Sequence, residues 1–172
     1  MVKKILIKSA RKLIQNKKEL ERKLKVKILV KGTSTTISGK EADEYFAERV
    51  LKALDFPFLV EDALLLLNEE YMFEVLNIKF FTKRHDLAVV RGRIIGKKGK
   101  TLGVLQNLSN CIVVVKDNNV AIIGRAEEFP VVQQAVISLI QGAKQGNVYG
   151  YLERRGKKKK HKKSEKFELE ED

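Results

Sequence analysis

The spacing of apolar residues in the second half of the chain predicts two short helices, two strands and a longer helix, in that order. In the helical parts these residues recur three or four positions apart, which places them on one helix face. The runs Cys111–Val115 and Val120–Ile123 flank the turn-forming sequence Lys-Asp-Asn-Asn and predict a pair of strands. The longer helix is expected over Glu127–Gln141, with Pro130 in its first turn, where a missing N–H costs little. The helix positions are Leu87, Val90, Ile94, Leu102, Leu105, Leu108, Val132, Ala135, Val136, Leu139 and Ile140.

The first half of the chain contains a weaker copy of the same pattern, and a strand is expected to precede each copy. The matching segments are Val26–Val30 with Cys111–Val115 and Ile37–Gly39 with Ile122–Gly124, and the expected first strands are Val2–Ile7 and Glu74–Phe81. The two pairs of segments have the same separation along the chain. The sequence therefore predicts an α+β fold with the order β-α-α-β-β-α occurring twice, each unit burying helices on one face of a small sheet.

A short apolar segment joins the two copies. Phe56-Pro57-Phe58 interrupts the pattern, and Glu61–Asn68 predicts one short helix that packs between the copies, because a free linker would be polar. The expected division is residues 1–56 for the first unit, 57–72 for the interdomain helix, 73–153 for the second unit and 154–172 for a disordered tail, basic and then acidic.

The segment Val90–Gly103, VRGRIIGKKGKTLG, contains a glycine loop with two candidate uses. Its end, Gly99-Lys100-Thr101, is similar to the end of a nucleotide-binding P-loop, which requires Gly-x-x-x-x-Gly-Lys-Ser/Thr. The first glycine of that pattern falls on Ile94, whose branched side chain would enter the space meant for phosphate oxygens. Lys116 also precedes Asp117, where a magnesium ion would need a carboxylate. An ATPase or GTPase is therefore disfavoured.

The same residues fit a clamp for the sugar-phosphate backbone of single-stranded RNA. Two helices would meet at Gly96–Gly99, where small glycines let phosphates approach the backbone and two lysines meet them as point charges. The N-terminus of the second helix adds unpaired N–H groups. Apolar side chains beside the loop would floor a groove for unstacked bases, and further cations would line its rim. The candidate RNA-binding residues are Arg91, Arg93, Ile94, Ile95, Gly96, Lys97, Lys98, Gly99, Lys100, Thr101 and Val113.

The loop, in this order of elements, resembles a type I KH domain, whose GxxG loop holds about four nucleotides of single-stranded nucleic acid. Two further segments, EDALLLLNEEYMFEV between the copies and QGAKQGNVYGYLERR after the second, resemble archaeal two-KH proteins related to the eukaryotic small-subunit assembly factor of the partner-of-Nob (Dim-type) family. The resemblance covers nearly the whole chain up to Arg155. It implies two tandem type I KH domains packed through a short apolar helix.

The resemblance also implies a function, that of a non-enzymatic RNA-binding factor in rRNA processing and biogenesis of the small ribosomal subunit. Such a factor binds near the 3′ end of 16S-type rRNA through its second KH domain and works beside the endonuclease that trims that end. Relatives are also linked to the α subunit of translation initiation factor two. The alternatives are a general RNA-binding protein without a ribosomal role and a KH-based protein-interaction scaffold.

The first copy departs from the family pattern at its loop. Gln15-Asn16-Lys17-Lys18 stands where the GxxG loop should be, with no glycine. Without glycine the backbone cannot turn tightly or approach phosphates closely. The first unit is therefore expected to be structural or to face a protein, although Lys17 and Lys18 could still touch phosphates nonspecifically.

The charge of the chain favours a polyanionic partner. Lys and Arg number 35 against 22 Asp and Glu, a net charge of +13. Residues 154–172 carry nine basic and five acidic side chains, so a net +9 belongs to the part expected to fold. A basic folded body favours nucleic acid. The tail segment Arg154–Lys166 is expected to be disordered and able to bind RNA electrostatically.

Other features limit the remaining classes of function. Cys111, the one cysteine, lies in an apolar run and is expected to be a buried small hydrophobe. His85 and His161 lie far from any ligand cluster, so neither a metal site nor a cofactor is expected. The longest uncharged runs, such as Thr101–Val115, are shorter than the ~20 apolar residues of a membrane span. With no catalytic pair of side chains and no signal peptide, a cytoplasmic protein that is not an enzyme is expected.

Overall fold

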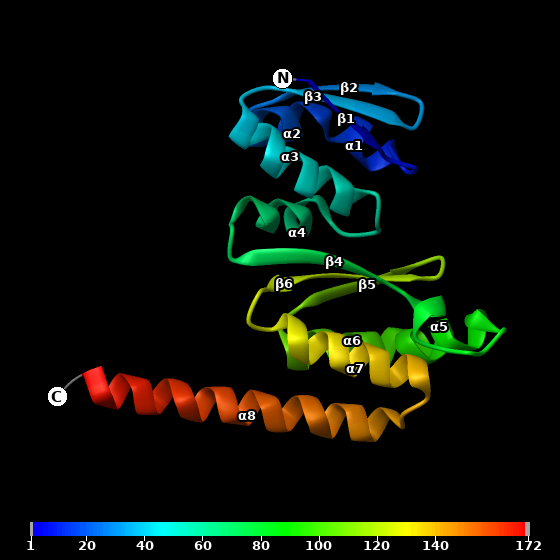
Figure 1. Ribbon diagram of the computed structural model, residues 1–172, viewed down its shortest axis with the longest axis vertical. Helices are drawn as coiled ribbons and strands as arrows, with labels where there is room; N and C mark the ends of the chain where they lie inside the picture. The colour runs from blue at the N-terminus through cyan, green and yellow to red at the C-terminus, as the bar shows by residue number, and fades with distance from the viewer. Residues whose placement is uncertain (1, 171–172) are drawn as a thin grey trace.

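The computed structural model describes the backbone of residues 2–170 and the side chains of residues 2–160. The chain forms two similar units stacked in one column, with the N-terminus at one end and a long C-terminal helix at the other (Figure 1). The first unit consists of β1 (Val2–Leu6), α1 (Arg11–Gln15), α2 (Lys17–Leu24), β2 (Lys27–Lys31), β3 (Ser34–Ser38) and α3 (Glu41–Leu54).

A connecting segment and the second unit follow. The connection holds α4 (Val60–Leu64) and a 3-10 turn, η1 (Leu65–Leu67). The second unit consists of β4 (Tyr71–Asn77), η2 (Ile78–Phe80), α5 (Leu87–Ile95), η3 (Lys97–Gly99), α6 (Lys100–Ser109), β5 (Ile112–Lys116), β6 (Asn119–Arg125) and α7 (Phe129–Gln141), and α8 (Gln145–Glu170) closes the chain. The order β-α-α-β-β-α expected from the sequence is present in both units.

Each unit contains one antiparallel three-stranded sheet. The strand order is β1-β3-β2 in the first sheet and β4-β6-β5 in the second. Strand β5 is therefore an edge strand that pairs only with β6. In the first unit the inward side chains of Ile5, Ile28 and Ile37 are buried, while Leu6 and Leu29 on the outer face are exposed. This alternation is what one buried sheet face requires.

The internal repeat extends to backbone conformation. Helix α2 ends at Lys25 and helix α6 ends at Asn110, and both residues have a left-handed φ of 56°. The turn after β2 contains Gly32 with φ 62°, and the turn after β5 contains Asp117 with φ 53° at the matching position. The two halves are thus copies in three dimensions and not only in their apolar pattern.

The same correspondence holds for a side chain that hydrogen-bonds to an edge strand. Glu21 of α2 accepts a hydrogen bond of 2.8 Å from the backbone N–H of Ile28 in β2. At the matching positions Gln106 of α6 accepts one of 3.0 Å from the N–H of Val113 in β5. Each bond satisfies a donor that an edge strand would otherwise leave unpaired.

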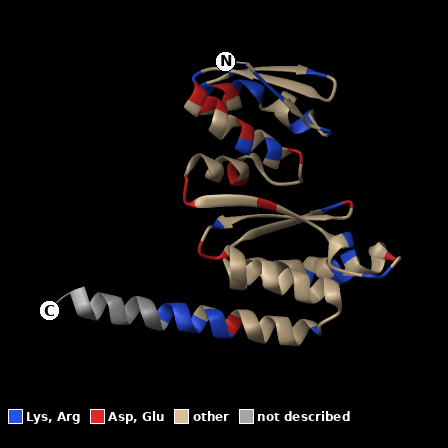
Figure 2. Cartoon of the chain, in the orientation of Figure 1, with Lys and Arg blue, Asp and Glu red and all other residues tan. Residues whose placement is uncertain are grey.

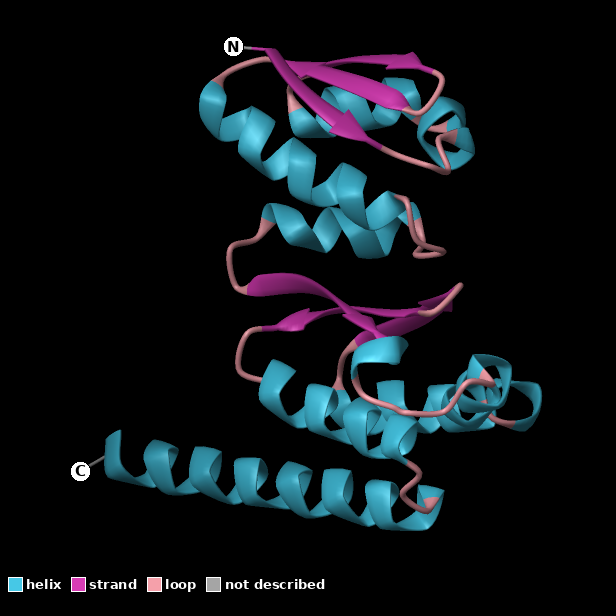
Figure 3. Ribbon diagram, turned by 45° about the vertical axis from the view of Figure 1, so that its right-hand side comes forward, coloured by secondary structure: helices cyan, strands magenta, loops and turns pink. Residues whose placement is uncertain are grey.

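The two sheets are covered differently, and this difference joins the units. The helices of the second unit cover one face of its sheet, and α3 of the first unit and α4 of the connecting segment cover the other face (Figure 3). Ala121 and Ile123 of β6 therefore belong to the same buried cluster as Leu51 of α3, Ala63 of α4 and Leu66 of η1. The expectation that residues 57–72 pack between the units is consistent with this shared core.

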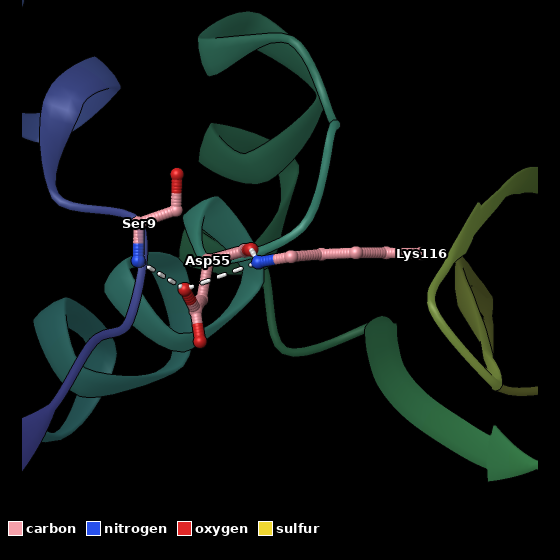
Figure 4. A network of polar contacts seen from close by, with 3 residues as sticks. All are labelled: Ser9, Asp55 and Lys116. Atoms are coloured by element: carbon pink, nitrogen blue, oxygen red, sulfur yellow. Dashed lines mark hydrogen bonds and ion pairs between the residues drawn. The ribbon is translucent and has the colours of Figure 1, made fainter.

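A polar network at the edge of this interface ties three segments together. The carboxylate of Asp55 accepts a hydrogen bond of 2.7 Å from the backbone N–H of Ser9. The Lys116 ammonium group lies 3.4 Å from the same carboxylate oxygen and also donates to the backbone carbonyl of Asp55 (Figure 4). Lys116 further stacks over the ring of Phe56, with its nitrogen 5.7 Å from the ring centre. The second sheet is thereby fixed to the end of α3.

The C-terminal tail differs from the sequence-based expectation. Instead of a disordered segment from residue 154, α8 continues as one helix from Gln145 to Glu170, and only residues 171 and 172 of the tail lie outside the described backbone. The helix starts on the second core, where Val148 and Leu152 are buried. Lys159 forms an ion pair of 2.8 Å with Glu128. Since lysine and arginine are good helix formers, the anchored helix propagates through the basic run.

Smaller differences concern element boundaries. The first strand of the second unit ends at Asn77, because residues 78–80 turn into η2 instead of continuing to Phe81. The connecting helix is divided between α4 and η1. Tyr149 and Tyr151 lie within α8, and Tyr151 packs against the second core. No helix within the described part of the chain is both long and apolar enough to cross a bilayer.

Candidate nucleic-acid interface

The segment between α5 and α6 is a tight turn built on unusual backbone angles. Gly96 has φ 74° and ψ 174°, a region that only glycine adopts readily. Lys98 and Gly99 follow with φ values of 52° and 73°. The amide of Gly99 donates to the carbonyl of Gly96 at 3.2 Å, which closes the turn. The backbone conformation therefore requires glycine at Gly96, and Gly99 takes a left-handed conformation that glycine adopts without strain.

The turn places cations at the start of a helix. Lys97, Lys98 and Lys100 are exposed, and none has an ion-pair or hydrogen-bond partner among residues 2–160. Helix α6 starts at Lys100, and no side chain caps its N-terminus. Its first-turn N–H groups are thus left for a ligand, and the helix dipole favours an anion there. Backbone donors and three free lysines therefore lie within one turn of the chain, at a helix N-terminus that can bind a phosphate.

Thr101 packs against the turn from the buried side. Its side chain is only 2% exposed and fills the space beside Gly96. The Thr101 hydroxyl accepts a hydrogen bond of 2.9 Å from Nε2 of Gln145, which also lies 3.2 Å from the carbonyl oxygen of Arg93. Gln145 is the first residue of α8. The C-terminal helix therefore holds both ends of the α5–α6 turn.

The apolar floor beside the turn is not made by all the residues expected from the sequence. Ile94 and Val113 are 0% and 1% exposed and lie in the core of the second unit, so burial places their side chains behind the surface and not on it. The exposed apolar face of α5 includes Ala88, Val89, Gly92 and Ile95, with Val89 and Ile95 47% and 36% exposed. This face leads along α5 to the glycine turn.

The two arginines of α5 are anchored to neighbouring segments instead of forming a free cationic rim. Arg91 donates a hydrogen bond of 2.5 Å to the side-chain oxygen of Asn118, in the β5–β6 turn. Arg93 donates one of 2.7 Å to the backbone carbonyl of Ala143, between α7 and α8. Both side chains are half-buried. They fix the orientation of α5, and the expectation that they also reinforce a cationic rim for RNA stays a prediction.

The first unit has no comparable turn. Only Asn16 separates α1 from α2, and hydrogen bonds continue across it, from Asn16 N–H to Lys12 at 3.2 Å and from Leu20 N–H to Asn16 at 3.0 Å. Within residues 11–24, all of which are described, no φ is positive. The corner is a kink between two helices, without the left-handed turn that the glycines give the second unit.

Basic side chains are spread over both units of the column. Lys and Arg lie on α5, in the turn after it and along the described part of α8, and also on the helices and strands of the first unit, whereas acidic residues are concentrated on the first turn of α3 (Figure 2). Within the part of the chain that has described side chains, no group of three or more metal-binding residues occurs. The site thus presents positive charge, backbone donors and a small apolar face.

The structure also reveals residues that sequence reasoning missed. Gln145 lies in the segment QGAKQGNVYGYLERR, which carried only a family resemblance. The sequence did not indicate that its side chain contacts α5 and α6. Phe80 was expected in a strand, but it lies on η2 with 83% of its surface exposed. The sequence contained one indication of this, the adjacent pair Phe80-Phe81. Neighbouring side chains point in different directions, so one ring can be buried while the other is exposed.

The chain matches a known domain family and known proteins. The family model described as Eukaryotic type KH-domain (KH-domain type I), for the second KH domain of PNO1, matches residues 72–157. A KH domain-containing protein of Methanocaldococcus jannaschii is 32% identical over 160 residues, which are 89% of this chain and 69% of that protein. The pre-rRNA-processing protein pno1 of Aspergillus fumigatus is 38% identical over 109 residues, 61% of this chain and 43% of its own length. The chain thus spans less than half of that fungal relative.

Two crystal structures from Pyrococcus horikoshii OT3 share the fold. Dim2p superposes with a TM-score of 0.81 and 32% identity, covering 90% of this chain and 99% of that chain. A chain of the a/eIF2alpha–aDim2p–rRNA complex superposes with a TM-score of 0.82 and 31% identity, covering 92% and 95%. These matches confirm the tandem arrangement of two KH-type units that the sequence predicted.

Proposed function

This chain belongs to the PNO1/Dim2p family of KH-domain proteins, and on that basis we propose that it is an RNA-binding factor in biogenesis of the small ribosomal subunit. Its second KH unit binds single-stranded rRNA near the 3′ end of the 16S-type molecule. The observation that carries this proposal is the α5–α6 turn, in which three unpaired lysines surround an uncapped helix N-terminus.

The proposed clamp acts on the RNA backbone and leaves the bases to the helix face. Phosphates approach Gly96 and Gly99 because neither carries a side chain, and Lys97, Lys98 and Lys100 neutralise them. Unstacked bases lie over Val89, Gly92 and Ile95. The half-buried Arg91 and Arg93 and the buried Ile94, Thr101 and Val113 hold this surface in place from behind.

The binding partners of the proposed factor are inferred from the names of related proteins. The solved Pyrococcus complex contains a/eIF2alpha and rRNA together with aDim2p, and the fungal relatives are pre-rRNA-processing proteins. We infer that this chain likewise binds rRNA and the α subunit of initiation factor two, and that it works beside the endonuclease that trims the 3′ end. The first unit, which lacks a clamp, is the surface that faces a protein or the subunit.

The proposed role is non-enzymatic and cytoplasmic. Holding an RNA strand needs cations, backbone donors and an apolar surface, and the turn and α5 supply all three. We propose residues 71–160 as the RNA-binding part, because α8 contributes Gln145 to the turn, and the preceding residues as the part that positions it.

Charge reversal in the turn tests the proposal. The double variant Lys97→Asp and Lys98→Asp places two anions where phosphates would lie, and both side chains are exposed, so the core is untouched. We expect single-stranded RNA binding in an electrophoretic shift assay to be abolished while the circular dichroism spectrum stays that of the native protein. A folded double variant with undiminished RNA affinity would rule out the clamp.

A milder variant quantifies the phosphate contacts. Replacing Lys97 and Lys98 by Ala removes two cations without adding repulsion. The slope of log affinity against log salt concentration for single-stranded RNA changes by about 0.7 per phosphate contact, so we expect the slope to become shallower by about 1.4. An unchanged slope would show that these lysines do not contact phosphates.

A further inference from the structure

Phe80 is an aromatic ring that the fold holds in solvent. It is 83% exposed, more than any other large apolar side chain with a described surface. The residues on either side of it are anchored: Ile78 is fully buried, and Phe81 packs against the second core. The ring is therefore displayed on a fixed turn, since its neighbours hold the backbone in place.

Hydrogen bonds define this turn further. The side-chain oxygen of Asn77 accepts a hydrogen bond of 3.0 Å from the N–H of Lys79 and caps η2. The N–H of Ile78 donates to the carbonyl of Asn118 at 2.9 Å. Asn118 is also the residue whose side chain accepts the hydrogen bond from Arg91 of α5. One residue of the β5–β6 turn thus connects the Phe80 turn to the helix that leads to the glycine clamp.

The surroundings of Phe80 are cationic. Lys79, Lys83 and Arg84 are exposed, and none has an ion-pair partner among the side chains that the structure describes. Two carboxylates, Glu74 and Asp86, lie equally near Phe80 along the chain. Glu74 accepts a hydrogen bond from the side chain of Gln133, and Asp86 accepts one of 3.4 Å from the N–H of Val89 and so caps α5. An exposed aromatic ring among free cations is the arrangement that binds single-stranded nucleic acid without base specificity.

The position of this cluster extends the proposed groove. Helix α5 spans nine residues, about 13 Å, from the segment after Phe80 to the glycine turn. Its exposed face of Val89, Gly92 and Ile95 runs between the two ends. An RNA strand held at the glycine turn and lying along this face leaves it beside η2, which contacts α5.

We propose that Phe80 stacks on the base of a nucleotide beyond the four or so that a KH groove holds, and that Lys83 and Arg84 bind the adjacent phosphates. This extension rests on the proposed RNA-binding function of the second unit. It lengthens the bound strand and raises affinity for any sequence, because every base has a face that can stack.

Tryptophan fluorescence tests the proposal directly, since the chain contains no tryptophan. In Phe80→Trp the new indole is the sole tryptophan reporter. We expect an eight-nucleotide RNA to quench it and a four-nucleotide RNA to leave it nearly unchanged. Leu29→Trp is the matched control, because Leu29 is 52% exposed on the outer face of the first sheet, and we expect neither RNA to alter its emission.

Affinities separate this proposal from the proposed function. Phe80→Ala should weaken binding of the eight-nucleotide RNA by between about five-fold and one hundred-fold, and should leave the four-nucleotide RNA unaffected. If both RNAs bind Phe80→Ala as they bind the unaltered chain, while Lys97→Asp with Lys98→Asp abolishes binding, the extension is overturned and the clamp stands. The exposed ring would then belong to a contact of another kind, such as a protein surface. If the unaltered chain binds neither RNA, the proposed function itself fails.

Discussion

The side chain of Thr101 fills the space that a side chain at Gly96 would need, its β-carbon lying 2.7 Å from the position of a β-carbon built on residue 96. The first residue of the glycine turn is therefore locked to the first turn of α6. Thr101 also accepts a hydrogen bond from Gln145 of α8. The glycine turn, α6 and α8 therefore meet at Thr101, behind the surface proposed to hold RNA.

The two glycines of the turn should respond differently to substitution. Gly96→Ala combines a glycine-only backbone conformation with a collision against Thr101, and we expect it to lower RNA affinity at least about ten-fold and to reduce the melting temperature. Gly99 has φ 73° and ψ 13° and open space around it, which asparagine tolerates. Gly99→Asn should therefore retain most of the stability. Calorimetry and RNA titration of both variants decide this, and equal effects would contradict it.

The matching corner of the first unit should contribute little to RNA binding. Lys17→Asp with Lys18→Asp reverses two charges at a corner that lacks the left-handed glycine turn of the second unit. We expect a much smaller loss of RNA affinity than from the same change at Lys97 and Lys98, measured side by side in one salt concentration. Equal losses would mean that the first unit grips RNA by another geometry.

Gln145 is predicted to be a positioning residue. Gln145→Ala removes the hydrogen bonds to Thr101 and to the Arg93 carbonyl, so the turn should become more mobile and RNA affinity should fall by about three- to ten-fold. Amide hydrogen exchange at Gly99 should also become faster, a change that a merely global loss of stability would spread over the core as well. Gln141→Ala, at the exposed end of α7, is the matched control and should change neither quantity.

Cys111 is expected to report unfolding through its reactivity. Burial raises the pKa of its thiol to about 11, so at pH 8 the folded protein holds almost no thiolate. Because the pKa is raised in the folded state, this term stabilises the fold at neutral pH and is lost as the pH rises through about 11. Labelling by a thiol reagent at pH 8 should be slow and should accelerate with denaturant in step with circular dichroism. Prompt labelling of the native protein would contradict the burial.

The repeat and the position of the glycine turn could be predicted from the sequence because both depend on local signals. Apolar spacing and glycine placement set the elements, and those elements are present in the order expected. The two adjacent isoleucines show where the prediction was limited. The spacing of Leu87, Val90 and Ile94 already indicated that Ile94 faces the core, yet the loop pattern also made it a groove residue, and burial decides for the core.

Contacts between distant segments could not be predicted. Arg93 was expected on a cationic rim, and the sequence did not indicate that it donates to the carbonyl of Ala143, which the fold alone brings near. The basic tail was expected to be disordered because its charges repel, yet Val148 and Leu152 anchor the helix that continues into it. Phe80 became visible as a surface residue only when the strand was seen to end at Asn77. In each case a tertiary contact or a chain turn outweighed the local pattern.

Competition binding at near-physiological salt, about 0.15 M, tests the central claim most directly. A labelled single-stranded RNA with the sequence of the small-subunit rRNA 3′ end is bound to the protein, and unlabelled 3′ segment or scrambled RNA of equal length is added. Phosphate contacts alone carry no sequence information, so a preference has to come from the bases and from the fit of the whole strand. The ribosomal role predicts that the 3′ segment competes at least about ten-fold better than the scrambled RNA. Equal competition by scrambled RNA would contradict that role and leave a general RNA-binding protein as the better description.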